Sequence, residues 1–404
     1  MAKPSGQYRS RLSALTSAAL ALSGVFAPFG AIYAAAPTDT AVSYRYSHYQ
    51  EPDLETNDVV SGSTDRYTID AHLLAVSGPL GAGFGYSLMA QGEILSGALP
   101  LDTELNEDDG TVDVVMSGAS IEEQRIGGTA SLGYYFSRGS VALNTGFSTE
   151  DDYQSTRVGL SGDVNFNNKQ TVVGYGLSQT SDVIDPEDDR LYLNSEFPIL
   201  PGEEGVRDIS SYYLSVSRVL TPSSQVQFGL SYTQRDGYLH DPYMRIDRRP
   251  ETRNEITYQV SYRRYIDTND SAVHFDYRYF EDNWGIDSYT TTIAVYRNIK
   301  RLQLIPSIRH YLQTGATFYT PYQPTDAQGD LIRYNYQSND ARLSDFGAFS
   351  VGMKARLTFG DFVGIFGTEY YKASQEYSPG RSDFLANPSL VEFFRVTVGL
   401  DYTF

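Results

Sequence analysis

The chain has 404 residues, with 50 acidic and 31 basic side chains, a formal net charge of −19 and no cysteine. The acidic excess disfavours nucleic-acid binding, which needs clustered lysine and arginine facing the phosphates. Without cysteine the chain has neither disulfides nor thiolate chemistry, so its stability must come from backbone pairing and packing.

The amino terminus has the pattern of a secretory signal. Basic residues precede a small and apolar stretch at 12–35, and the alanines at 34–36 offer a cleavage site before Pro37. A retained membrane anchor is the alternative, but glycines and a proline interrupt the stretch. We therefore expect a signal peptide at 1–36 and one exported domain at 37–404.

Alternation of apolar and polar residues with a period of two recurs along the exported part, and it is clearest at 255–263. Such alternation is typical of strands that separate an apolar face from a polar one. The predicted strands, about sixteen, lie near 39–49, 65–76, 82–95, 121–137, 140–150, 153–166, 169–181, 207–220, 223–236, 251–266, 271–281, 288–299, 302–314, 344–359, 362–375 and 391–404.

The links between these strands alternate in length. Short links rich in turn formers are typical of periplasmic turns, and the longer links between them would be outer loops. An even strand number then places both termini in the periplasm. The long links at 96–120, 181–206 and 315–342 are candidates to fold into the lumen.

The last strand ends on an aromatic residue, which few soluble domains do. Thr397, Gly399, Tyr402 and Phe404 have the spacing of the carboxyl-terminal signal that the barrel assembly machinery recognises. We therefore expect this machinery to be a partner and the cell outer membrane of a Gram-negative bacterium to be the location, after export.

These patterns predict an all-β fold, a transmembrane antiparallel up-and-down β-barrel. No later segment has the roughly 18 consecutive apolar residues of a spanning helix, and a membrane protein without such helices must be a closed barrel. The 33 tyrosines and 20 phenylalanines suit aromatic girdles at two membrane interfaces. A soluble sandwich or propeller would explain neither the signals at the two ends nor the alternating links.

Polar positions on each strand are expected to face the interior, because charge on the lipid face is costly. The candidates for the lumen lining are Arg66, Asp70, His72, Arg125, Arg157, Arg263, His274, Asp276, Arg278, Arg309, Lys354, Arg356 and Arg395. Basic residues outnumber acidic ones among them, which favours anionic solutes. The alternative is that these residues form ion pairs that brace the wall and select nothing.

Signals for enzyme or metal chemistry are weak. His48 and His310 are expected to face lipid, but neither has a serine two residues away on its own face, so we predict no catalytic residues. The acidic stretch 182–189 could collect Ca²⁺, but it lacks EF-hand spacing. A solvated loop, bridged by divalent ions to lipopolysaccharide, is the preferred interpretation, and we predict no metal site and no cofactor.

Local strings resemble a barrel family known as domain of unknown function 3570. They are DRYTIDAHLLAVSGP at 65–79, SGALP at 96–100, MSGASIEEQR at 116–125 and GFSTEDDYQS at 146–155, within the first third of the exported chain. The family pattern has SGASP where this chain has SGALP. The resemblance implies an outer-membrane barrel and brings neither a substrate nor catalytic residues.

The leading hypothesis is an outer-membrane channel or exporter for a small polar solute, for which the basic lining favours an anion. A non-conducting barrel that binds a structural partner is the alternative, and a lipid-modifying enzyme comes third. Outer-membrane lipid and lipopolysaccharide are the expected surroundings, and homo-oligomerisation is left open.

Overall fold

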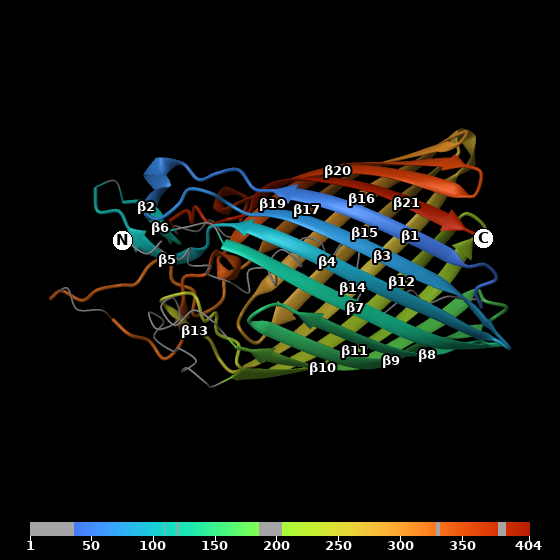
Figure 1. Cartoon of the computed structure of the whole chain (residues 1–404), viewed down its shortest axis with the longest axis horizontal. Helices are drawn as coiled ribbons and strands as arrows, with labels where there is room; N and C mark the ends of the chain where they lie inside the picture. Colours follow the sequence, from blue (N-terminus) through green and yellow to red (C-terminus); the bar gives the residue numbers. More distant parts are fainter. Residues whose placement is uncertain (1–35, 109, 119–120, 186–203, 329–331, 379–384) are drawn as a thin grey trace, which may run out of the picture.

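The computed structural model describes residues 36–404 except 109, 119–120, 186–203, 329–331 and 379–384. The predicted signal peptide, apart from Ala36, and part of the acidic stretch at 182–189 therefore lie outside the described residues. Within those residues, sixteen antiparallel strands form a closed barrel, which confirms the predicted architecture (Figure 1).

The wall strands all lie within a few residues of their predicted positions. They are β1 (Ala41–Gln50), β3 (Thr68–Gly81), β4 (Phe84–Gly97), β7 (Ile121–Phe136), β8 (Gly139–Thr149), β9 (Tyr153–Phe166), β10 (Thr171–Ile184), β11 (Gly205–Thr221), β12 (Ser224–Gly237), β14 (Thr252–Ile266), β15 (Ser271–Asp282), β16 (Asp287–Ile299), β17 (Leu302–Gln313), β19 (Phe346–Phe359), β20 (Phe362–Ser374) and β21 (Glu392–Thr403).

The barrel closes where the first strand meets the last. β1 pairs with β21 in continuous register from Ala41 opposite Thr403 to Gln50 opposite Phe394. Thr40 and Phe404 exchange two backbone hydrogen bonds of 2.9 Å just beyond these strands. The first strand therefore begins, and the last one ends, at the barrel end with the short turns (Figure 1).

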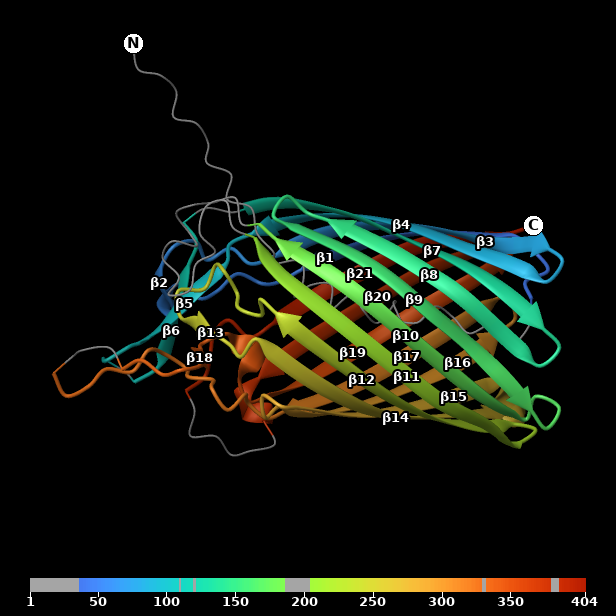
Figure 2. The ribbon, with the colours of Figure 1, turned by 90° about the horizontal axis from the view of Figure 1, so that it is seen from below.

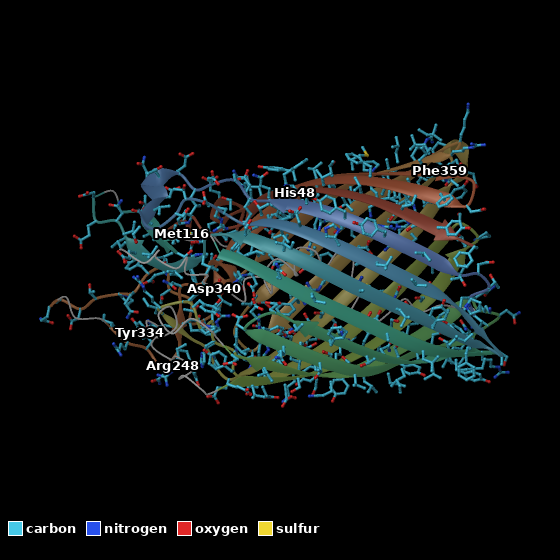
Figure 3. All side chains as sticks on the ribbon, viewed as in Figure 1. His48, Met116, Arg248, Tyr334, Asp340 and Phe359 are labelled. Atoms are coloured by element: carbon cyan, nitrogen blue, oxygen red, sulfur yellow. The ribbon has the colours of Figure 1, made fainter. Side chains whose placement is uncertain are left out.

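The two faces of the wall differ in chemistry. One parity carries large exposed apolar side chains such as Leu74, Leu132 and Ile308, and this is the lipid-facing side. Because directly paired residues share a face, the strand register assigns every wall residue to the outside or the lumen. Phe362 stacks on Phe359 and on Tyr402 outside the wall, with ring centroids 5.8 and 4.6 Å apart. Figure 3 shows Phe359 at the turn end.

The long links build structure of their own at the opposite end (Figure 2). There β2 (Val59–Ser61), β6 (Val112–Met116) and β5 (Pro100–Leu105) form a small sheet, and β13 (Asp247–Arg248) pairs with β18 (Gln337–Ser338). Four three-residue 3-10 helices complete the described structure: η1 (Thr56–Asp58), η2 (Asp267–Asn269), η3 (Ala341–Leu343) and η4 (Gln375–Tyr377). Among the described residues no helix is long and apolar enough to span a membrane.

Candidate functional site

The loop end of the barrel is covered by three long links, whose described parts of 98–117, 238–250 and 314–345 we call the cap. Arg245 donates its backbone N–H to Leu101 O at 3.0 Å, and the Thr103 hydroxyl donates to Pro321 O at 2.7 Å. These links leave the wall from β4, β12 and β17, and β4 and β12 stand six strands apart in the ring of sixteen. Their contacts must therefore cross the mouth of the barrel.

The cap has an apolar core that reaches the inner wall. Leu99, Leu101 and Tyr243 from the cap pack with inward residues of the wall, including Ile69 and Leu95, both fully buried. Removal of this apolar surface from water holds the cap against the barrel. The inner face of β3 and β4 next to the cap is therefore dry.

A network of charged side chains joins two links of the cap. Arg249 binds Asp247 at 2.9 Å and Asp340 at 2.8 Å, and Arg342 binds Asp340 and Asp241, each at 2.8 Å. Asp340 lies where the loops meet the barrel (Figure 3). Burial opposes ionisation of Asp340, but Arg342 and Arg249 outweigh it and hold the pKa of that carboxyl well below its usual range.

The same network perturbs two further groups. His240 Nδ1 accepts a hydrogen bond of 2.8 Å from the Arg249 backbone, and burial together with Arg249 and Arg248 lowers the pKa of His240 to about 4. Burial raises the pKa of Asp247 to about 6, against the opposing attraction of Arg249. The sequence analysis missed all of these residues, although the clustered arginines of RIDRRP at 245–250 are a detectable signal.

Ten of the predicted lining residues lie on the inward face by register: Arg125, Arg157, Arg263, His274, Asp276, Arg278, Arg309, Lys354, Arg356 and Arg395. Some of them form ion pairs. Arg263 contacts Asp276 at 2.7 Å, and Arg395 contacts Glu369. Arg356 lies 3.7 Å from Asp401, which also binds Arg45 at 2.5 Å.

Three inward cations form what we call the basic wall: Arg278 on β15, Arg309 on β17 and Lys354 on β19. Each of these side chains is exposed although it faces the interior. Among the described residues, no carboxylate oxygen lies within 4.0 Å of their charged nitrogens. The basic wall therefore presents positive charge to the lumen.

The structure corrects the prediction for three residues, two by their strand register and one by its burial. Asp70 pairs with His48, and His72 pairs with Tyr46, on the same face as the exposed Leu74, so both point outward and not into the lumen. Arg66 precedes β3 and is buried beneath the loops, where its Nε donates to Glu51 at 2.7 Å. The prediction assumed that the polar residues of β3 face the lumen. On this strand the inward positions near the cap, such as Ile69, are apolar, so Asp70 and His72 are left on the outer face.

The outward residues of β1 and β3 bind one another. The Tyr46 hydroxyl donates to Asp70 Oδ1 at 2.5 Å, and His48 Nδ1 lies 2.9 Å from the same oxygen. The Tyr44 hydroxyl lies 2.7 Å from His72 Nδ1. These contacts satisfy polar groups on the lipid-facing wall, where unpaired polar groups are costly. Figure 3 shows His48 on that wall.

The residues of the predicted assembly signal have structural roles in the seam of the barrel. A Cβ on Gly399 would lie 2.5 Å from Arg45 Cδ, so glycine there leaves room for the arginine to reach Asp401. Thr397 Oγ1 lies 2.9 Å from Ser47 Oγ, and Tyr402 stacks on Phe404. Their recognition by the assembly machinery stays a prediction.

Solved structures share the overall shape at low identity. CdiB from Acinetobacter baumannii is 8% identical, with a TM-score of 0.50, and the match covers 90% of this chain and 60% of that chain. A bacterial polysaccharide outer membrane secretin is 11% identical, with a TM-score of 0.47, and covers 90% of this chain and 98% of its own. OccD3 (OpdP) from Pseudomonas aeruginosa is 10% identical, with a TM-score of 0.42, covering 92% and 93%.

Likeness at these identities concerns the fold alone, which is that of an outer-membrane barrel. No curated protein matches the chain. A family model matches residues 12–390, far beyond the strings that carry the resemblance in the sequence. The chain therefore belongs to the family described as protein of unknown function (DUF3570).

Proposed function

We propose that this barrel is a non-enzymatic outer-membrane channel that passes or exports a small polar solute and prefers anions. The observation that carries the proposal is the basic wall. Arg278, Arg309 and Lys354 are exposed on the inward face, and no carboxylate oxygen of a described residue lies within 4.0 Å of their charged nitrogens. Glu255 and Glu369 act on Arg278 and Lys354 only from a longer range. Cations that only braced the wall would be paired across strands, as Arg263 is with Asp276.

Neighbouring charges strengthen the local positive potential. Lys354 lies within electrostatic range of Arg45, Arg356 and Arg395, and Arg278 lies within range of Arg309. Glu369 and Asp401 are the carboxylates paired with that group, two against the four cations Arg45, Lys354, Arg356 and Arg395. An aqueous lumen lined in this way raises the local concentration of anions.

The cap favours a second candidate, a barrel that does not conduct and serves a partner. Links from β4 and β12 hydrogen-bond across the mouth, and an ion network ties the cap together. For the channel, the same contacts mean that conductance should be small while the cap is closed. Removing Arg249 should loosen the cap, because Asp247 and Asp340 lose their shared guanidinium.

Planar bilayers containing the purified full-length barrel test the proposal. The double variant Arg309→Gln, Lys354→Gln should lower the ratio of anion to cation permeability, read from the reversal potential in a salt gradient. We expect a loss of about twofold per charge, since a unit charge about 8 Å from an ion in water contributes about 0.5 kcal/mol. Arg218→Gln removes one exposed charge outside the lumen and is the control.

The outcomes separate the two candidates. If neither the wild type nor Arg249→Ala shows conductance steps at any voltage, the channel proposal is wrong and the non-conducting barrel stands. If steps occur but the double variant keeps the wild-type reversal potential, the basic wall selects nothing.

A further inference from the structure

Three carboxylates converge at the loop end of β7, β8 and β9. Glu123 lies near the start of β7, and Glu150 and Asp152 lie in the link between β8 and β9. One oxygen from each lies within 4.8 Å of the others, and the three residues are 0%, 5% and 1% exposed. The cluster therefore concentrates negative charge in a place from which water is largely excluded.

Charges of one sign at this distance repel strongly. Carboxylates this close together repel one another far more strongly where water is excluded than they would on the surface. The repulsion has to be offset by a cation or by protonation.

Arg125 offsets it only in part. Its Nε lies 3.5 Å from Glu150 Oε1, and its Nη1 lies 3.7 Å from Glu93 Oε2, on the neighbouring strand. Arg125 donates its Nε–H to Ser148 Oγ at 2.8 Å, so this N–H is not available to Glu150 as a hydrogen-bond donor. One guanidinium thus faces two buried carboxylates at distances longer than a hydrogen bond.

Glu150 supplies a second observation, which points to a ligand. Its side chain is fully buried, and its partners among the described residues are the Arg125 guanidinium and the neighbouring Glu123 carboxyl, so no N–H or hydroxyl group donates a hydrogen bond to its oxygens. Glu93 Oε2 is buried in the same way without a donor. A buried carboxylate is costly unless it is hydrogen-bonded, paired or bound to a metal.

We propose that Glu123, Glu150 and Asp152 bind a divalent cation, and that the cation is Ca²⁺. Oxygen ligands lie about 2.3 to 2.6 Å from Ca²⁺, so two oxygens on one ion can be up to about 5 Å apart, and these three fit that limit. Carboxylate-rich sites of variable geometry suit Ca²⁺, whereas Mg²⁺ is smaller and requires near-ideal octahedral geometry.

The site would connect the rim of the barrel to the cap. The Tyr243 hydroxyl, from the cap, donates to Asp152 Oδ2, and Asp185 donates its backbone N–H to Asp152 O at 2.8 Å. An ion bound by Asp152 would therefore hold β7, the β8–β9 link and the cap in one arrangement. This proposal is independent of whether the barrel conducts.

Calorimetric titration of the refolded full-length barrel with CaCl₂ tests the site. We expect one saturable site in the wild type and a loss of affinity of at least tenfold in Glu150→Gln and in Asp152→Asn. Asp163→Asn is the matched control, because Asp163 is also buried but its oxygens already accept hydrogen bonds from Ser140 and Asn165. Its affinity for Ca²⁺ should equal that of the wild type.

Terbium luminescence supplies a second readout that does not depend on conduction. Tyr243 contacts Asp152, so light absorbed by tyrosine should excite bound Tb³⁺, and added Ca²⁺ should displace it. Tyr243→Phe should keep the calorimetric Ca²⁺ site and lose part of the Tb³⁺ emission. The proposal is overturned if the wild type shows no saturable Ca²⁺ binding, or if both carboxylate variants bind as the wild type does while remaining folded.

Discussion

Asp70 is a carboxylate on the lipid-facing wall, and two neighbours hold it there. The Tyr46 hydroxyl and His48 Nδ1 both contact Asp70 Oδ1, from the adjoining strand β1. An ionisable side chain in this position would be costly without such partners. Hydrogen bonds to a charged group are worth about 1.5 to 3 kcal/mol, so each partner matters for the stability of the wall.

Tyr46→Phe should therefore lower the free energy of unfolding by about 2 kcal/mol. The phenyl ring keeps the apolar contacts, and Asp70 loses its shorter hydrogen bond. Urea titration of the barrel in lipid vesicles measures the change. Tyr258→Phe is the control, because Tyr258 also faces outward and its hydroxyl makes no hydrogen bond to a described residue. Equal losses in the two variants would contradict the role given to Asp70.

Residue parity predicted most side-chain directions and failed on β3 for a physical reason. The rule assumes a polar interior, and it holds at Arg309 and Lys354, which are exposed on the inward face. Near the cap, Ile69 faces inward and is buried against the apolar cap core, so the polar residues of β3 are left on the outside. The alternation of apolar and polar residues within one strand does not show which part of the inner face is covered by the cap.

At the scale of elements, the cap is the part that the sequence did not predict. Each wall strand can be predicted from its own sequence, because apolar and polar residues alternate along it. In contrast, β13 and β18 are two residues long, and Asp247 of β13 pairs with Ser338 of β18, 91 positions away in the chain. The small sheet of β2, β6 and β5 likewise forms within links expected to be loops. Such pairings depend on tertiary contacts and leave little local signal.

Two titratable groups of the cap respond to pH in opposite directions. His240 has a pKa of about 4 in the closed cap, below its ordinary value near 6.5, so its contribution to closure is present above pH 6.5 and is lost as pH falls through 4. Asp247 has a raised pKa of about 6, so its contribution is present below about pH 4 and is lost as pH rises through 6.

The closed cap of the wild type should therefore change little in stability between pH 6 and pH 4. His240→Gln removes the contribution of the histidine and leaves that of Asp247. The closed cap of this variant should therefore gain about 2 kcal/mol of stability on acidification from pH 6 to pH 4. Asp247→Asn removes the contribution of the aspartate, so the closed cap of this variant should lose a similar amount of stability over the same pH range. The rate of proteolytic cleavage within 238–250 measures closure. A wild type that loosens steeply in this window, with both variants following it, would show that other groups control the cap.

The whole molecule is closed by one seam, where β1 meets β21, and the seam carries the residues of the predicted assembly signal. Tyr402 stacks on Phe362 with ring centroids 4.6 Å apart, so it belongs to the aromatic girdle of the turn end. Phe404 is 64% exposed, and its ring contacts Tyr402 at 5.3 Å. The closure itself uses the backbone of Phe404, through its two hydrogen bonds with Thr40.

Phe404→Ala should separate assembly from stability, because it removes an exposed ring and keeps the backbone bonds. We expect the free energy of unfolding of the refolded barrel to fall by less than about 1 kcal/mol, since an exposed side chain buries little apolar surface. If the assembly machinery recognises this ring, the amount of barrel inserted in cells should fall several-fold. Phe362→Ala is the matched control, because it removes a ring from the same girdle on β20, outside the signal. Its loss of stability should be at least as large while insertion stays near the wild-type level, and insertion that follows stability in both variants would show that Phe404 acts only through packing.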